Sequence, residues 1–217
     1  MRNLRSQDIA DISNVVFHIV GCGAIGSSVA TQLARLGGDK FWLYDFDKVG
    51  IENVGVSQYI DNDIGKLKVD ALYTHIKDIG CSIEVTCRPT KFQHYMGTNK
   101  DILVLGLDSM AARMEVVSEL AIQPVKPAFV IDGRMGAEQY QQYIYDNITV
   151  KKYEKDWYSD EDSDQEPCTR KATSYCSNMS GSFISNSIKN LVMKQPYFKE
   201  IIFNFSTLIL DKKKLVS

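Results

Sequence analysis

The stretch Val15-Val-Phe-His-Ile-Val-Gly-Cys-Gly-Ala-Ile-Gly26 decides the fold, because it has the pattern of a buried strand that turns through glycines into a helix. Gly21 permits the tight turn after the strand, and Gly23 lets the backbone approach a phosphate. Gly26 lets the helix pack close to the sheet, and the free N–H groups of the first helical turn then point at an anion. The stretch therefore predicts a phosphate-binding turn that needs no lysine.

A second stretch supplies the acidic residue that such a turn pairs with. The predicted strand Lys40-Phe-Trp-Leu-Tyr44 is followed by Asp45, about twenty residues beyond the glycines, where a carboxylate can accept hydrogen bonds from ribose hydroxyls. Strand, glycine turn, helix and acidic residue together are far more specific than the glycines alone. We therefore expect a nucleotide that contains adenosine. Dehydrogenases and ATP-using adenylating enzymes share this half of a fold, so the fold leaves the chemistry open.

Composition narrows the class of protein. The 217 residues, 44% hydrophobic and 24% charged, are enough for one substantial core, so we expect a single domain over residues 1–217. A formal net charge of -2 does not favour a nucleic-acid partner. The five cysteines are odd in number and lack metal-type spacing, which favours reduced thiols in the cytoplasm and no zinc site. Neither a membrane span nor a signal peptide is expected.

Strand and helix patterns alternate through the first part of the chain. The apolar run Ile102–Leu107 is typical of a central strand covered on both faces, and Asp108 follows at its carboxyl end, where open α/β sheets bind ligands. The alternation predicts a doubly wound, mostly parallel, Rossmann-like α/β sheet. The expected strands are 15–20, 40–45, 83–88, 101–106 and 128–132, and the expected helices are 26–36, 65–79 and 109–122.

The C-terminal part has a different pattern. Partial alternation over 138–150 predicts an antiparallel strand beside the parallel set, and apolar spacing over 169–194 predicts a helix. Residues 200–205 and 207–210 complete an antiparallel C-terminal extension. The acidic block at about 153–167 should repel itself, so we expect a flexible loop there.

A series of polar residues beyond the glycine turn is more specific. It begins with Asp47, Asn53 and Gln58, continues through Asp63-Ile-Gly-Lys-Leu-Lys68, and ends in Gly106-Leu-Asp-Ser-Met-Ala-Ala-Arg113. In this series, over roughly residues 15–136, the chain resembles the ubiquitin-activating-enzyme-like adenylating family that includes ThiF and MoeB. In that family ATP adenylates the C-terminal glycine of a small ubiquitin-like or sulfur-carrier protein. The resemblance also implies a homodimer.

The resemblance assigns a role to each matching position. Asp45 holds the ribose, Asp47 shapes the pocket beside it, Asn53 and Lys68 hold the triphosphate, and Asp108 holds the magnesium ion. Because an attacking carboxylate and the α-phosphate are both anions, catalysis needs positive charge and in-line positioning more than an acid or a base. The implied ATP-binding set is Gly21, Gly23, Gly26, Asp45, Asp47, Asn53, Gln58, Lys68 and Asp108.

Structural alternatives exist for these positions. Lys68 is otherwise a solvated helix lysine, and Lys66 beside it is an equal candidate without the family's spacing. Asp108 is otherwise the N-cap of the following helix, a role compatible with ligand binding. Arg113 matches the family at a structural position. We favour Lys68 and Asp108 as site residues because of the motif.

The chain also departs from the family pattern. Family members usually carry Arg-Gln a few residues after the asparagine, whereas this chain has Val56 and Ser57. Loss of a charge that stabilises a transferring phosphoryl group commonly costs about a hundredfold or more in rate. Either Arg2 or Arg5 compensates, as does a partner subunit's arginine in relatives, or the protein is a slow or inactive member.

Cys168, in Glu166-Pro-Cys-Thr-Arg-Lys171, resembles the thioester cysteine of ubiquitin-activating enzymes. A nearby helix N-terminus and the two following cations would lower its thiol pKa; the alternative is a packed apolar cysteine, as we expect for Cys176. His18 is expected in the core. His75 and His94 have no acidic or cysteine partners at ligand spacing in the sequence, and both are expected on surfaces. Arg134 either contacts the carrier tail or is solvated.

The sequence thus favours an ATP- and magnesium-dependent adenylyltransferase acting on the C-terminus of a small ubiquitin-like or sulfur-carrier protein or a peptide. One alternative is a catalytically impaired binding subunit that kept the fold. The other is an NAD-dependent oxidoreductase, which explains Gly21 to Asp45 but leaves Asn53, Lys68 and Asp108 without a role.

Overall fold

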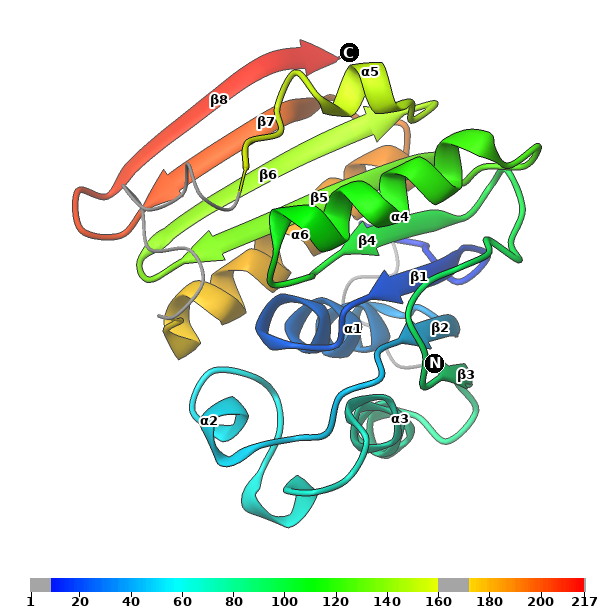
Figure 1. Ribbon diagram of the computed structural model, residues 1–217, viewed down its shortest axis with the longest axis vertical. Helices are drawn as coiled ribbons and strands as arrows, with labels where there is room; N and C mark the ends of the chain where they lie inside the picture. Colours follow the sequence, from blue (N-terminus) through cyan, green and yellow to red (C-terminus); the bar gives the residue numbers. More distant parts are fainter. Residues whose placement is uncertain (1–8, 160–171, 217) are drawn as a thin grey trace.

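The computed structural model describes residues 9–159 and 172–216. In this part of the chain eight strands form one sheet in the order β3-β2-β1-β4-β5-β6-β7-β8 (Figure 1). The strands are β1 (Val16–Val20), β2 (Lys40–Tyr44), β3 (Glu84–Arg88), β4 (Ile102–Leu105), β5 (Phe129–Gly136), β6 (Gln139–Asp146), β7 (Tyr197–Asn204) and β8 (Ile209–Val216). The helices are α1 (Ala24–Leu36), α2 (Ile51–Val54), α3 (Lys68–Ile79), α4 (Met110–Ile122), α5 (Val150–Tyr153) and α6 (Ser174–Val192), with one 3-10 turn, η1 (Asp61–Asp63).

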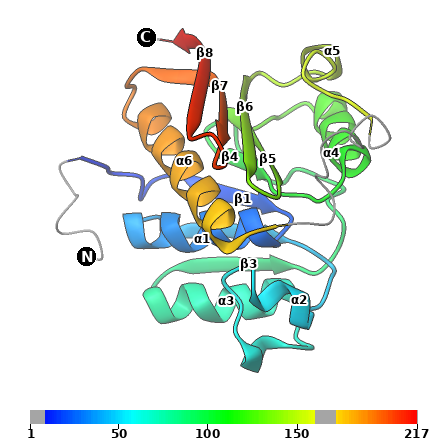
Figure 2. The same cartoon turned by 90° about the vertical axis from the view of Figure 1, so that its left-hand side faces the viewer.

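Strands β1 to β5 are parallel to their neighbours and form the doubly wound part of the sheet. Residues of α1, α3 and α6 pack with one face of the sheet, and residues of α4 and α5 pack with the other (Figure 2). All four residues of β4 are buried, as expected of a central strand covered by helices on both faces. The predicted α/β, mostly parallel architecture is therefore confirmed.

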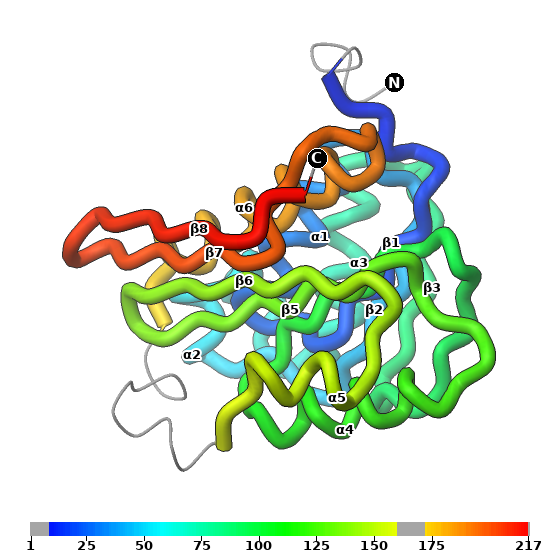
Figure 3. The backbone as a smooth tube through the Cα atoms, turned by 90° about the horizontal axis from the view of Figure 1, so that it is seen from above, coloured from blue at the N-terminus to red at the C-terminus, as the bar shows by residue number. Residues whose placement is uncertain are grey.

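Strands β6, β7 and β8 are antiparallel to their neighbours and confirm the predicted C-terminal extension. The hairpin of β7 and β8 projects beyond the parallel part of the molecule (Figure 3). Its strands are longer than the sequence predicted, and β8 runs through Lys212, Lys213 and Lys214. An exposed edge strand buries little side-chain surface, so it keeps charged residues that obscure its pattern.

The sequence predictions of secondary structure are wrong in two kinds of place: very short elements, and a segment that contacts from elsewhere in the chain hold in position. The four-residue helices α2 and α5 and the turn η1 were not predicted, because they are shorter than a periodic pattern. The expected flexible loop at 153–167 is wrong at its beginning, since Tyr153 is fully buried and the indole of Trp157 donates to the Met110 carbonyl at 3.0 Å. Residues 160–167 lie outside the described part.

The predicted environments of two buried side chains are confirmed. His18 is buried in β1, between the Tyr44 hydroxyl and the Asp101 carboxylate, at 3.1 and 3.3 Å. Cys176 is buried where α6 packs on the sheet. Among the helices of residues 9–159 and 172–216, none combines the length and apolar character needed to span a membrane.

Candidate functional site

A cavity of about 320 Å³ opens at the carboxyl ends of β1, β2 and β4. The chain order of the sheet reverses between β1 and β4, so this is the switch point at which open α/β sheets bind ligands. Three segments that follow these strands line the cavity: Gly21 with Gly23, Asp45 to Asp47, and Gly106 to Asp108. Lys68 enters it from the first residue of α3.

The glycine turn has the geometry that the sequence predicted. Gly21 adopts a φ of +87°, and a Cβ there would lie 2.7 Å from the Gly106 carbonyl oxygen. A Cβ on Gly26 would lie 1.9 Å from the Gly21 carbonyl oxygen, so this glycine closes the helix onto the turn and does not line the cavity. Helix α1 begins after Gly23 without a side-chain capping bond. Its N-terminus is therefore suited to an anion.

Asp45 is fixed by backbone groups at the end of β2. Its carboxylate accepts hydrogen bonds from the Cys22 N–H and the Asp47 N–H, both at 2.8 Å. Burial raises the pKa of Asp45, and the nearby Lys68 ammonium opposes that shift. The carboxylate is thus held at the edge of the cavity in a fixed orientation, with Lys68 as its counter-charge.

Lys68 lies among carboxylates. Its Nζ is 2.9 Å from an Asp47 oxygen, and its side chain is only 12% exposed. Burial by itself would lower the pKa of Lys68, but the carboxylates of Asp45, Asp47 and Asp108 outweigh burial and raise it. Lys68 therefore remains charged at neutral pH and presents a fixed positive charge to the cavity.

Asp108 is exposed at the end of β4 and lines the cavity. The suggestion that it caps the following helix is wrong: Ser109 is the N-cap of α4, and its hydroxyl accepts from the Ala112 N–H at 3.1 Å. Because Ser109 takes the capping role, the Asp108 carboxylate is not needed at the helix end. Its proposed magnesium role remains a prediction.

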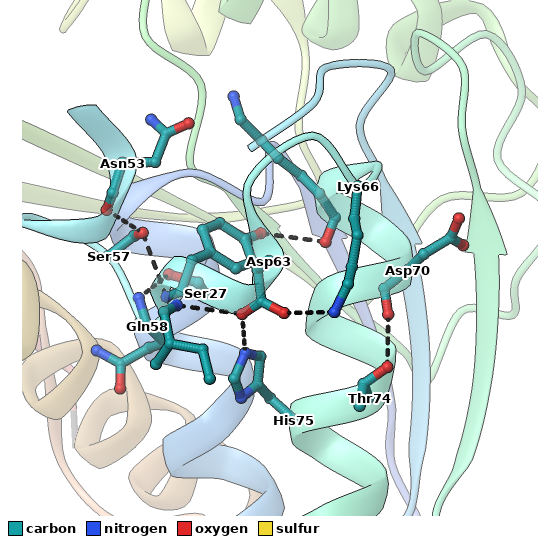
Figure 4. Close-up of polar contacts among 12 residues, drawn as sticks. Ser27, Asn53, Ser57, Gln58, Asp63, Lys66, Asp70, Thr74 and His75 are labelled. Carbon is teal, nitrogen blue, oxygen red and sulfur yellow. Dashed lines mark hydrogen bonds and ion pairs between the residues drawn. The ribbon is translucent and has the colours of Figure 1, made fainter. Parts of the chain in front are cut away.

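Asn53 and Gln58 do not line the cavity. The side-chain oxygen of Asn53 accepts a hydrogen bond from the Gly50 N–H at 2.9 Å. The backbone carbonyl of Asn53 accepts one from the Ser57 hydroxyl (Figure 4). The Gln58 amide donates to the Asn178 side chain at 2.8 Å, which joins it to α6. Both side chains hold loop structure here, so the triphosphate role of Asn53 and the ATP-binding role of Gln58 remain predictions.

The alternative lysine points elsewhere. Lys66 is about half exposed and forms an ion pair with Asp63 at 3.0 Å (Figure 4). His75 is partly exposed, and its Nε2 lies 2.6 Å from the same Asp63 carboxylate, a partner that ligand spacing in the sequence did not indicate. The sequence did not reveal this pair, because the loop that contains Asp63 has no periodic pattern from which its packing against His75 of α3 could be predicted. His94 is exposed, as expected.

The buried Asp132 lies one strand away from the cavity residues. Arg113 and Arg134 both form ion pairs with its carboxylate, and the Tyr153 hydroxyl donates to it at 2.9 Å. The structural role expected of Arg113 is confirmed. The solvated interpretation of Arg134 is wrong, because it is 3% exposed and lies over the ring of Tyr143 at 4.4 Å, and its contact with a carrier tail remains a prediction. Only long-range packing determines that environment.

Several cavity residues carried no recognisable signal in the sequence. Lys91 and Phe92 come from the loop after β3, and Glu115 and Val116 come from α4. They reach the cavity because the loop after β3 crosses toward α4, where Lys91 and Glu115 face each other at 3.8 Å. No motif marks such loop residues.

Some predicted residues lie outside the described part of the chain: Arg2, Arg5 and Cys168. Within residues 9–159 and 172–216, no group of three or more His, Cys, Asp or Glu side chains is arranged to hold a metal ion. A magnesium ion that is bound through one carboxylate and substrate phosphates needs no such group. The magnesium prediction therefore rests on Asp108 and the nucleotide.

The sequence is similar to a known protein family and to several curated proteins. A family model described as the ThiF family matches residues 1–210. The tRNA threonylcarbamoyladenosine dehydratase 2 of Saccharomyces cerevisiae is 36% identical over 84 residues, which are 37% of this chain and 19% of that protein. Ubiquitin-like modifier-activating enzyme 5 of Branchiostoma floridae is 31% identical over 114 residues, 45% of this chain and 28% of that protein. The chain thus spans less than a third of these curated relatives.

A solved structure of MccB from E. coli with ATP is similar in fold. The two chains superpose with a TM-score of 0.74 and 17% sequence identity, covering 96% of this chain and 65% of the MccB chain. At this identity the similarity shows a shared fold.

Proposed function

The chain belongs to the ThiF family, and from this premise we propose that it binds ATP with magnesium and adenylates the C-terminus of a small protein or peptide. The observation that carries the proposal is the convergence of Asp45, Lys68 and Asp108 on one cavity beside the uncapped N-terminus of α1. Asp45 can accept hydrogen bonds from ribose hydroxyls, Lys68 and the α1 N-terminus can bind phosphate oxygens, and Asp108 can bind the magnesium ion. E. coli MccB, whose fold this chain shares, has been solved with ATP and with AMPCPP and MccA, which supports the proposal.

The charge of the cavity favours ATP as its magnesium complex. Among the described residues that line it, four carboxylates, Asp45, Asp47, Asp108 and Glu115, outnumber two ammonium groups, Lys68 and Lys91. A bare polyphosphate would meet net negative charge. An added divalent cation removes this repulsion, and hard carboxylate oxygens such as those of Asp108 are suitable ligands for it.

The chain's own groups would act by binding and orientation. Asp45 accepts the ribose hydroxyls, the α1 N-terminus and Lys68 bind phosphate oxygens, and Asp108 holds the magnesium ion. When bound, that ion neutralises charge on the phosphates. The carboxylate of the acceptor attacks the α-phosphorus, a P–O bond forms, and the bond to the β-phosphate breaks with release of pyrophosphate. Fixed positive charge beside two reacting anions is the main contribution to the rate.

The acceptor that we propose is a small ubiquitin-like or sulfur-carrier protein, or a peptide, and the assembly is a homodimer in the cytoplasm. A dimer would let Arg5 of one subunit supply the cation that Val56 does not. Cys168 remains the candidate thiol for a later transfer step, and the single domain over 1–217 also remains a proposal.

One observation favours a second candidate function, a catalytically impaired binding subunit. Ser57, at the position of the missing Arg-Gln pair, donates to the Asn53 carbonyl and does not line the cavity. Within the described residues the phosphate end of the cavity thus relies on Lys68 and the α1 N-terminus. An NAD-dependent oxidoreductase remains the less favoured alternative.

Exchange of radiolabelled pyrophosphate into ATP distinguishes these functions. We expect magnesium-dependent exchange when the protein is supplied with its acceptor from a panel of ubiquitin-like proteins and peptides, and loss of exchange when the acceptor's terminal carboxylate is amidated. Magnesium-dependent ATP binding without exchange across the panel would favour the binding subunit. Binding of NADH but not ATP would contradict both the adenylating function and the binding-subunit function.

A further inference from the structure

Tyr59 is a buried tyrosine that links the glycine turn after β1 to the first residue of α3. It lies between α2 and α3, is 2% exposed, and was not among the residues predicted for the site. Its hydroxyl is 2.5 Å from the Cys22 carbonyl oxygen in the glycine turn and 3.1 Å from the Lys68 carbonyl oxygen at the beginning of α3. One side chain therefore contacts both the anion-binding turn and the backbone of the cavity lysine.

Two hydrogen bonds from outside the helix hold the backbone of Lys68 at the beginning of α3. Its N-cap, Leu67, provides no side-chain capping bond. The Lys68 N–H donates to the Asp47 carbonyl at 2.9 Å, and the Lys68 carbonyl receives the Tyr59 hydroxyl. These two hydrogen bonds lie on either side of the Lys68 Cα. They set the direction in which the side chain leaves the helix toward the cavity.

The loop behind Tyr59 is held rigidly. Asp63 is 3% exposed and accepts hydrogen bonds from the Ile60 N–H at 3.1 Å, from Lys66 at 3.0 Å and from His75 at 2.6 Å (Figure 4). The His75 ring also lies 6.3 Å from the Tyr59 ring. Because α3 and the loop are joined in this way, the Tyr59 ring has little freedom to turn away.

The hydroxyl is suited to be a permanent donor. Burial raises the pKa of Tyr59 well above its ordinary value, and nearby Cys22, Asp45 and Asp63 act in the same direction. The phenol therefore keeps its proton at neutral pH. That one proton is shared between two carbonyl oxygens that belong to different elements.

We propose that Tyr59 is a positioning residue for nucleotide binding, which fixes the Lys68 ammonium relative to the glycine turn so that both meet the same phosphate group. This inference rests on the proposed function, because it takes the cavity to be an ATP site. Tyr59 touches no part of the nucleotide in this scheme. Its effect is larger at the phosphate end than at the ribose end, since Asp45 accepts from the Asp47 N–H, which Tyr59 does not contact, as well as from the Cys22 N–H.

The test compares affinities of magnesium-bound ATP and adenosine in four proteins: the wild type, Tyr59→Phe, Lys68→Ala and the double variant. Loss of the hydroxyl should weaken ATP binding about fivefold to tenfold, as for a lost hydrogen bond, and leave adenosine binding within about twofold. In the Lys68→Ala background, Tyr59→Phe should no longer change ATP affinity, because the group it positions is gone.

Tyr73→Phe is the matched control, since Tyr73 lies on α3, is 40% exposed and faces Lys77 instead. It should bind ATP like the wild type. Melting temperatures establish that each variant is folded. If Tyr59→Phe does not fold, Asp63→Asn replaces it, since it loosens the same loop and should also weaken ATP more than adenosine.

Three outcomes overturn the inference. They are an unchanged ATP affinity in Tyr59→Phe, an equal loss of ATP and adenosine affinity, and an undiminished effect of Tyr59→Phe without Lys68. A wild type that binds no ATP overturns the proposed function itself, and the inference with it. The wild-type titration therefore separates the two failures.

Discussion

Two charge clusters lie in neighbouring parts of the molecule, one at the cavity beside the carboxyl end of β4 and one around Asp132 within β5, and they have opposite arrangements. Around Lys68, one cation faces the three carboxylates of Asp45, Asp47 and Asp108 at the wall of an open cavity. Around Asp132, one fully buried carboxylate faces two guanidinium groups and a tyrosine hydroxyl. The first cluster has an excess of negative charge beside an open cavity, where a ligand can meet it. The second has one more cation than carboxylate, but it is enclosed by the protein, and its guanidinium groups also donate to backbone carbonyls.

The pKa shifts follow the same contrast. Burial by itself would raise the pKa of Asp132, but Arg113 and Arg134 outweigh burial and lower it, so the carboxylate stays ionised. For Asp45, burial prevails over Lys68 and the pKa is raised. The closed cluster around Asp132 should therefore govern stability, whereas the open cluster around Lys68 should govern binding.

The largest expected effect comes from breaking the closed cluster. Asp132→Ala leaves two buried guanidinium groups without their counter-charge, and we expect a loss of about 3–5 kcal/mol in the free energy of unfolding. Urea unfolding followed by circular dichroism measures it. The control is Asp146→Ala, an exposed carboxylate paired with Lys152 and Lys199, which should lose less than about 1 kcal/mol. A similar small loss in both variants would show that the two clusters do not differ in this way.

A smaller effect, on binding, comes from the open cluster. Lys68→Ala should weaken ATP binding about tenfold or more, the value of a charge-assisted hydrogen bond. Its free energy of unfolding should change little, because the carboxylates around Lys68 line the cavity and are therefore accessible to solvent. Calorimetric titration with ATP and magnesium measures the affinity.

Lys66→Ala is the control for that titration, since Lys66 lies two residues away but pairs with Asp63. It should bind ATP within about twofold of the wild type. Should Lys66→Ala lose affinity and Lys68→Ala keep it, the phosphate lysine has been misassigned.

The sequence predicted the open cluster better than the closed one, for a physical reason. Gly21 and Asp45 follow strands directly and Asp108 lies three residues beyond β4, so their position at the carboxyl ends of the strands is a consequence of local structure. The environment of Arg134 depends on residues such as Tyr153 that pack from a distant segment. No local pattern encodes such a contact.

The same reasoning explains the errors in the fold. The central parallel strands β1 and β4 are buried, so their apolar runs were recognisable, and their predicted and observed bounds differ by at most one residue at each end. Strand β8 is an exposed edge, and the predicted strand 207–210 captured only its beginning. The pairing of His75 with Asp63 depends on how the loop before α3 folds back, and the sequence offers no signal for that.

The central claim, that the open cluster is a magnesium-dependent ATP site, is tested most directly by calorimetric titration of the full chain. ATP is titrated with magnesium and with a chelator, NADH is titrated separately, and Asp108→Ala provides the comparison. We predict binding of ATP that requires magnesium, loss of that requirement or of binding in Asp108→Ala, and no binding of NADH. Binding of NADH in place of ATP, or ATP binding that is indifferent to both magnesium and Asp108, would contradict the account.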